Sequence, residues 1–183
     1  MSDYPIYDHP IIALREAKCR HDRVRLICFS AHVDMGETGW LTQAVHEELF
    51  DGSCSMLLGV RAPTEESIWD RAEKNFAYMM TTGDLITYTP AFPTDVYRIS
   101  LDEVPTHLHI DVSVLDPIYI PAASRPEWAG MSTHWFKHFL GSQSHQNTNW
   151  VGLSIGGFNP VIDPITKISI NSMIDLHLAN RKE

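Results

Sequence analysis

Apolar residues are gathered in short blocks along the first half of the chain, and three of these blocks predict strands. Residues 24–30 (VRLICFS) and 53–60 (SCSMLLGV) are nearly continuous apolar runs, which is typical of strands covered on both faces. Residues 85–89 (LITYT) are rich in β-branched and aromatic side chains and predict a third strand. With helices between them, residues 24–89 have the order strand, helix, strand, helix, strand, which favours a parallel sheet.

The two intervening segments carry apolar side chains at helical spacing. The first is expected to run from Trp40 to Phe50 and to stop at Asp51-Gly52. The second is expected to be capped by Thr64 and to run to about residue 81.

The second half is less regular and predicts a partly antiparallel arrangement. Residues 107–114 (HLHIDVSV) alternate between apolar and polar, as a half-exposed strand does. Ser132 is expected to cap a short helix ending at Leu140, and residues 151–155 predict another strand. Near the end, Asp163-Pro164 favours a helix start while the following apolar residues alternate like a strand, so both readings stay open. The sequence therefore predicts an α/β fold of two or three layers, a sheet with helices on one or both faces. Residues 1–183 are expected to form one globular domain.

Composition narrows the range of partners. The net charge is −9 and no run of Lys and Arg is present, which disfavours nucleic acids and anionic membranes. No apolar run approaches the roughly 20 residues that span a bilayer, and the N-terminus does not resemble a signal peptide. We therefore expect a cytoplasmic protein that acts on a small molecule, and assembly into a homo-oligomer is left open.

Histidines supply the first candidate chemistry. His107, His109 and Asp111 project from one face of their predicted strand, and His134 and His138 share one face of a predicted helix. Both spacings can chelate a zinc-like divalent metal. The strand residues are expected as ligands, with the helix residues completing the site or acting as catalytic acid or base. Alternatively, each group of histidines is simply the solvent-exposed, polar face of an amphipathic strand or helix, with no role in catalysis.

The loop after the first strand supplies the second candidate. His32 and Asp34 lie where open α/β sheets bind ligands, at the carboxyl end of a strand. Residues 31–34 (AHVD) resemble the A-H-P-D-D segment of zinc-dependent deacetylases of the LmbE type, with Val33 in place of the proline and Met35 in place of the second aspartate. That resemblance implies a metal site, but its activity is not transferred.

Three functions follow from these patterns. The leading hypothesis is a metal-dependent hydrolase or lyase acting on a small molecule through a histidine-rich site. The second is a flavin- or nucleotide-binding protein, because residues 53–90 resemble the central part of flavin-reductase-like split barrels. The third is a protein-interaction domain without catalytic activity.

Overall fold

A computed structural model of the chain describes residues 8–87, 103–141, 148–159, 161 and 163–179. Its named strands form one sheet of five, in the order β3-β2-β1-β4-β5, and every pairing between them is parallel. The strands are β1 (Arg25–Phe29), β2 (Met56–Val60), β3 (Tyr78–Thr81), β4 (Thr106–Asp111) and β5 (Trp150–Gly156). The α/β prediction is confirmed, whereas the partly antiparallel second half is wrong, because β5 returns beside β4 in the same direction after a helical crossover.

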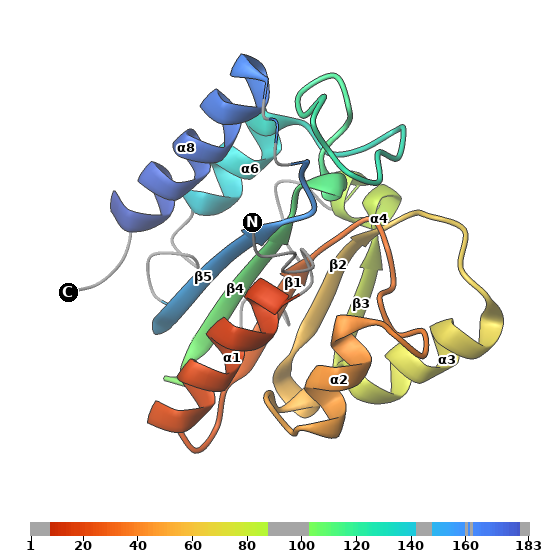
Figure 1. Ribbon diagram of the computed structural model, residues 1–183, viewed down its shortest axis with the longest axis vertical. Helices are drawn as coiled ribbons and strands as arrows, with labels where there is room; N and C mark the ends of the chain where they lie inside the picture. The colour runs from red at the N-terminus through yellow and green to blue at the C-terminus, as the bar shows by residue number, and fades with distance from the viewer. Residues whose placement is uncertain (1–7, 88–102, 142–147, 160, 162, 180–183) are drawn as a thin grey trace.

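Helices cover both faces of the sheet (Figure 1). One apolar cluster joins the sheet to α1, α2 and α3, and a second joins it to α6, α8 and residues 112–123. The helices are α1 (Asp8–Arg20), α2 (Trp40–His46), α3 (Glu66–Asn75), α4 (Thr82–Thr87), α6 (Thr133–Leu140) and α8 (Pro164–Ala179), with short 3₁₀ turns η1 (Gly52–Cys54) and η2 (Val112–Val114). The architecture is thus three-layered. No helix in the described ranges has the length and apolar character needed to cross a membrane.

The order of the strands reverses next to β1. The chain moves outward from β1 to β2 and β3, then returns to place β4 and β5 on the other side of β1. Parallel α/β sheets bind ligands at such a reversal, outside the carboxyl ends of the two central strands. The loops that follow β1 and β4 therefore meet where a site is expected.

The prediction of a strand at residues 85–89 is wrong, because the third strand of the chain lies earlier. The helix expected to reach residue 81 ends at Asn75, and Tyr78–Thr81 forms the strand instead. Residues 82–87 form α4, while residues 88–89 of the predicted strand lie outside the described residues. A reciprocal capping pair explains α4, because the Asp84 carboxylate accepts from the Thr81 N–H and the Thr81 hydroxyl accepts from the Asp84 N–H.

The structure decides how β4 is buried and whether the last segment is a helix or a strand. β4 is buried on both faces rather than half-exposed, because β1 and β5 flank it and helices cover its polar side. The last segment is the helix α8, and its start is fixed by Asp163, whose Oδ1 accepts from the N–H groups of Ile165 and Thr166. The predicted Ser132 cap of α6 is confirmed, since its hydroxyl accepts from the Trp135 N–H.

Candidate active site

Two carboxylates lie close together at the carboxyl ends of β1 and β4. Asp34 belongs to the loop after β1, and Asp111 is the last residue of β4. Asp111 caps the η2 turn, where its Oδ1 accepts from the Ser113 N–H at 2.8 Å. Gly157, which follows β5, lies so near Asp111 that a Cβ atom there would be 2.1 Å from Oδ1. The φ of Gly157 is +78°, a backbone conformation that favours glycine.

The guanidinium group of Arg125 connects the two carboxylates. Its Nη1 donates to Asp34 Oδ1 at 2.9 Å and its Nη2 donates to Asp34 Oδ2 at 2.8 Å. Nη2 also lies 3.7 Å from Asp111 Oδ2. The exposed fractions of the Asp34 and Asp111 side chains are 10% and 8%. Carboxylates so poorly hydrated need a cation, hydrogen bonds or protonation, and Arg125 supplies the cation.

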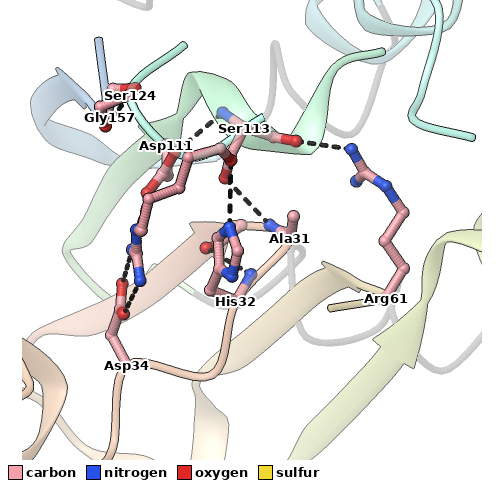
Figure 2. Close-up of polar contacts among 10 residues, drawn as sticks. Ala31, His32, Asp34, Arg61, Asp111, Ser113, Ser124 and Gly157 are labelled. Carbon is pink, nitrogen blue, oxygen red and sulfur yellow. Dashed lines mark hydrogen bonds and ion pairs between the residues drawn. The ribbon is translucent and has the colours of Figure 1, made fainter. Parts of the chain in front are cut away.

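Serine and histidine side chains hold the loop after β1 in place. The Ser30 hydroxyl accepts from the His32 N–H at 3.0 Å, and the Ser113 hydroxyl accepts from the Ala31 N–H at 3.4 Å. His32 Nε2 lies 3.1 Å from the Arg125 carbonyl oxygen, so this nitrogen carries the proton and donates. Figure 2 shows His32 and Asp34 beside Asp111 and Ser113.

Arg61 connects the η2 turn to a second loop on the same side of the site. Its guanidinium donates to the carbonyl oxygens of Ser113, Val114, Leu115, Glu127 and Trp128. Burial lowers the pKa of Arg61, although Glu127, Asp116 and Asp111 act in the opposite direction. This arginine therefore fixes the backbone that carries Asp111 and Ser113 (Figure 2).

On the same face of β4 as Asp111, the side chains of His107 and His109 form a buried hydrogen-bonded group with Ser154. Ser154 of β5 places its hydroxyl 2.8 Å from His109 Nδ1 and 2.9 Å from His107 Nε2. Burial lowers the pKa of His107 to about 4, with a further contribution from His177, and lowers the pKa of His109 to about 3, with a further contribution from His107. Both imidazoles are therefore neutral at pH 7.

The hydrogen bonds also indicate which nitrogens carry the protons. The Ser154 hydroxyl has one hydrogen, so it can donate to only one of the two rings. His107 Nδ1 is buried without a partner among the described residues and is packed against Gly152. A bare nitrogen there is less costly than a buried unpaired N–H. This favours His107 Nε2 as donor to Ser154, Ser154 as donor to His109 Nδ1, and a proton on His109 Nε2.

A small pocket opens between these groups, and we call it the carboxylate pocket. Its volume is about 150 Å³, and its lining consists of Pro10, Asp34, Trp40, His109, Asp111, Ser124, Arg125, Gly156 and Gly157. The Trp40 and His109 rings meet edge to face, with centroids 4.8 Å apart. Burial raises the pKa of Asp111. The hydrogen bonds from Ser113 lower this pKa, and the negative charge of Asp34 raises it further.

The predicted metal ligands do not form a chelating set. His107 and His109 both face Ser154, and Asp111 faces Arg125. Across residues 8–87, 103–141, 148–159, 161 and 163–179, no group of three or more His, Cys, Asp or Glu side chains could hold a metal ion.

The α6 histidines do not join the β4 row. Leu108 and Ile110 pack in the apolar cluster that contains α6, so His109, which alternates with them, faces the other side of the sheet. His134 and His138 contact each other through Nε2 atoms 3.1 Å apart, on the exposed surface. The prediction that they complete one site with His109 is therefore wrong.

Of the residues that sequence patterns singled out, Asp34, His109 and Asp111 line the carboxylate pocket, and His32 contacts the Arg125 carbonyl oxygen beside it. Arg125, Trp40 and Ser154 were missed. Arg125 lies in a proline-rich stretch with no periodic pattern, and its bond to Asp34 joins segments 91 positions apart. Trp40 and Ser154 were visible only as core or strand residues. The placement of Ser154 follows from the parallel register of β4 and β5, in which His109 lies opposite Ser154. The placement of Trp40 follows from the packing of α2 on that side of the sheet.

Several solved structures share this fold. Proclavaminate amidino hydrolase from Streptomyces clavuligerus is 19% identical with a TM-score of 0.80, and the match covers 94% of this chain and 62% of that chain. Formimidoylglutamase from Bacillus subtilis is 18% identical with a TM-score of 0.80, covering 92% of this chain and 57% of that chain. A triple mutant of the T. brucei arginase-like protein, bound with Mn²⁺, is 20% identical with a TM-score of 0.72, covering 91% and 56%.

Sequence comparison agrees with these structures. An agmatinase of Blochmanniella floridana is 23% identical over 148 residues, which are 76% of this chain and 46% of that protein. The chain thus spans about half the length of this curated relative. Neither a flavin-reductase-like barrel nor a deacetylase of the LmbE type is supported, because the sheet is open and parallel and the arginase-family profile matches residues 8–179. A match over that much of the sequence shows that the chain belongs to the arginase family.

Proposed function

We propose that the chain binds a small molecule bearing an amidinium or guanidinium group in the carboxylate pocket. The charge of the pocket wall carries this proposal. Asp34 and Asp111 contribute two carboxyl groups, and Arg125 contributes one guanidinium, so the ionised wall keeps one negative charge. A small cation is attracted to such a pocket, and a neutral molecule of the same shape is not.

The size and shape of the pocket support a flat head group. A volume of about 150 Å³ accommodates only a few heavy atoms, and the indole of Trp40 and the ring of His109 form part of the wall. Planar cations donate parallel hydrogen bonds to carboxylates and also stack on aromatic faces. Arg125 already makes the first of these contacts on Asp34, so a ligand cation would share the Asp34 oxygens with it or bind at Asp111.

The names of the relatives point to the same chemical class. They are an agmatinase, an amidino hydrolase and a formimidoylglutamase. An amidino group has one carbon bonded to two nitrogens, and a formimidoyl group becomes such a group when it is attached to an amine. Among small cations, we therefore propose amidinium and guanidinium compounds as the ligands of the pocket.

Calorimetry with simple probes tests the binding proposal. Acetamidinium and methylguanidinium are expected to bind the purified chain, while acetamide and methylurea, which have similar shapes without the charge, are expected not to bind. Asp34→Asn should weaken cation binding at least tenfold, since it removes one of the two carboxylates. Asp70→Asn, an exposed residue on α3, is the matched control. Equal affinity for acetamide and acetamidinium would exclude the proposal.

Hydrolysis of the bound group is a second candidate, favoured by family membership, because arginase-family enzymes are metal-dependent hydrolases. The donor set described above does not fit a metal ion, so no metal-assisted step is assigned to this chain. Ammonia release from acetamidinium, measured with and without MnCl₂, tests this candidate. Release that requires Mn²⁺ would support the metal-dependent hydrolase predicted from the sequence, and binding without release would support a ligand-binding role.

A further inference from the structure

The site contains its own cation. Arg125 is bound to Asp34 through both guanidinium nitrogens, at 2.9 and 2.8 Å, and lies 3.7 Å from Asp111. Asp34 lies in the loop after β1 and Asp111 ends β4, and the guanidinium is the positive group between them. A divalent ion seated between the same oxygens would have to share them with Arg125 or displace it.

The imidazoles and hydroxyls nearby are already engaged in other contacts. His109 lines the pocket but bonds Ser154 through Nδ1, and His32 donates from Nε2 to the Arg125 carbonyl oxygen. Ser30 and Ser113 contribute neutral hydroxyls that already accept from the backbone N–H groups of His32 and Ala31. Asp111 Oδ1 already accepts from the Ser113 N–H. First-row divalent ions are held in proteins mainly by carboxylate, imidazole and thiolate groups, and a serine hydroxyl is a weak substitute.

Displacement of Arg125 is also opposed by the rest of its loop. His32 Nε2 donates to the Arg125 carbonyl oxygen at 3.1 Å, so the backbone of this residue is attached to the loop after β1. The neighbouring Ser124 donates its N–H and its hydroxyl to the Gly157 carbonyl oxygen, at 2.8 and 3.0 Å. The guanidinium is thus positioned from both sides of the site.

We propose that Arg125 is a built-in counter-ion that takes the place of a divalent metal between Asp34 and Asp111, so that the folded chain binds no metal ion there. This role of Arg125 is independent of which small molecule the carboxylate pocket binds. It departs from the metal dependence of the family and assigns the charge balance of the two carboxylates to this arginine.

Metal titration of the wild-type chain is the first test. Mn²⁺ binding is followed by electron paramagnetic resonance of the free ion, and Zn²⁺ binding by calorimetry. We expect less than one tenth of an equivalent bound at 1 mM free Mn²⁺, a concentration about tenfold below the expected dissociation constant. Stoichiometric binding of either ion at micromolar concentration, lost in Asp34→Asn, would overturn the proposal.

A charge series at position 125 is the second test. Arg125→Met removes the charge and keeps much of the length, while Arg125→Lys keeps the charge. We expect Arg125→Met to lower the melting temperature by roughly 5 °C and Arg125→Lys to lower it less. Adding 1 mM MnCl₂ should raise the melting temperature of Arg125→Met and leave the wild type unchanged, because only the variant offers two uncompensated carboxylates.

The matched control is Arg23→Met, which removes an arginine paired with Asp51 at the surface, at 2.6 Å. It should not acquire stabilisation by Mn²⁺. If Arg125→Met does not fold, Arg125→Lys and the wild-type titration still decide. Equal melting temperatures for Arg125→Met and the wild type would refute the counter-ion role, whatever ligand the carboxylate pocket binds.

Discussion

Replacing Gly157 by alanine tests how tightly the end of β5 is packed on Asp111. The backbone of Gly157 has a φ of +78°, and an added Cβ would lie 2.1 Å from Asp111 Oδ1 and 2.6 Å from Cγ. Nonbonded heavy atoms cannot approach so closely, so either the Asp111 side chain or the β5 loop must move. Asp111 is the side chain that caps η2 and faces Arg125, and its displacement would disturb both contacts.

The expected cost has two parts. A left-handed backbone costs alanine about 1 kcal/mol relative to glycine. Loss of the buried hydrogen bond between Asp111 and the Ser113 N–H adds about 1–3 kcal/mol, because the displaced groups stay partly desolvated. Gly157→Ala should therefore lower the free energy of unfolding by about 2–4 kcal/mol and the melting temperature by roughly 5–15 °C.

Urea unfolding followed by circular dichroism measures this difference, with Gly156→Ala as the control. A Cβ at Gly156 would lie 3.6 Å from His109 Cε1, which is ordinary contact, so this variant should lose less than about 1 kcal/mol. Binding of acetamidinium should weaken in Gly157→Ala, because the displaced Asp111 is part of the pocket lining. Equal free energies of unfolding for the two variants would show that Asp111 is not held in this position.

Three further predictions concern the residues around the pocket. Arg61→Ala should lower the free energy of unfolding by about 2–4 kcal/mol in urea, since several buried carbonyl groups lose their donor, and Arg61→Lys should restore only part of it. Ser154→Ala should cost about 1–3 kcal/mol and move the imidazole ¹⁵N signals, because His107 and His109 lose their shared partner. Finally, the two histidines have lowered pKa values, of about 4 and about 3, so below pH 6.5 the unfolded chain binds protons that the folded chain does not. Stability should therefore be complete above pH 6.5 and fall as the pH drops towards 4, by up to about 1.4 kcal/mol per pH unit for each histidine. Urea titrations at several pH values should show a smaller slope in a His107→Gln/His109→Gln variant than in the wild type.

Much of the fold could be predicted from periodicity and capping residues. β1, β2, α2 and α6 lie within or close to the predicted ranges, because each has a clear apolar pattern and a recognisable stop. The misplaced third strand had a usable signal, since Thr81 and Asp84 have the spacing of a capping box. The β-branched residues of 85–89 favour a strand, and this local hydrogen-bonding pair outweighs their propensity over residues 82–87.

The candidate site was harder to predict because its contacts are long-range. His32 and Asp34 could be placed by the rule that ligands bind at the carboxyl ends of parallel strands. The row of polar residues on β4 was correctly assigned to one face, but a wet surface and a buried hydrogen-bonded layer produce the same alternation. Only the cover provided by Trp40 and the position of Ser154 distinguish the two. Arg125 depends on a loop conformation that no local pattern encodes.

The reversal of strand order next to β1 has a consequence for the kinetics of folding. β1 and β2 can pair once the first part of the chain is available, whereas β1 pairs with β4, Ile27 opposite Leu108, only after a much longer loop has closed. Closing longer loops costs more entropy, and non-local parallel pairing is slow. The carboxylate pocket needs the β1–β4 pairing, so we expect it to be absent from early intermediates. A ligand of the pocket should then slow unfolding while leaving the folding rate nearly unchanged.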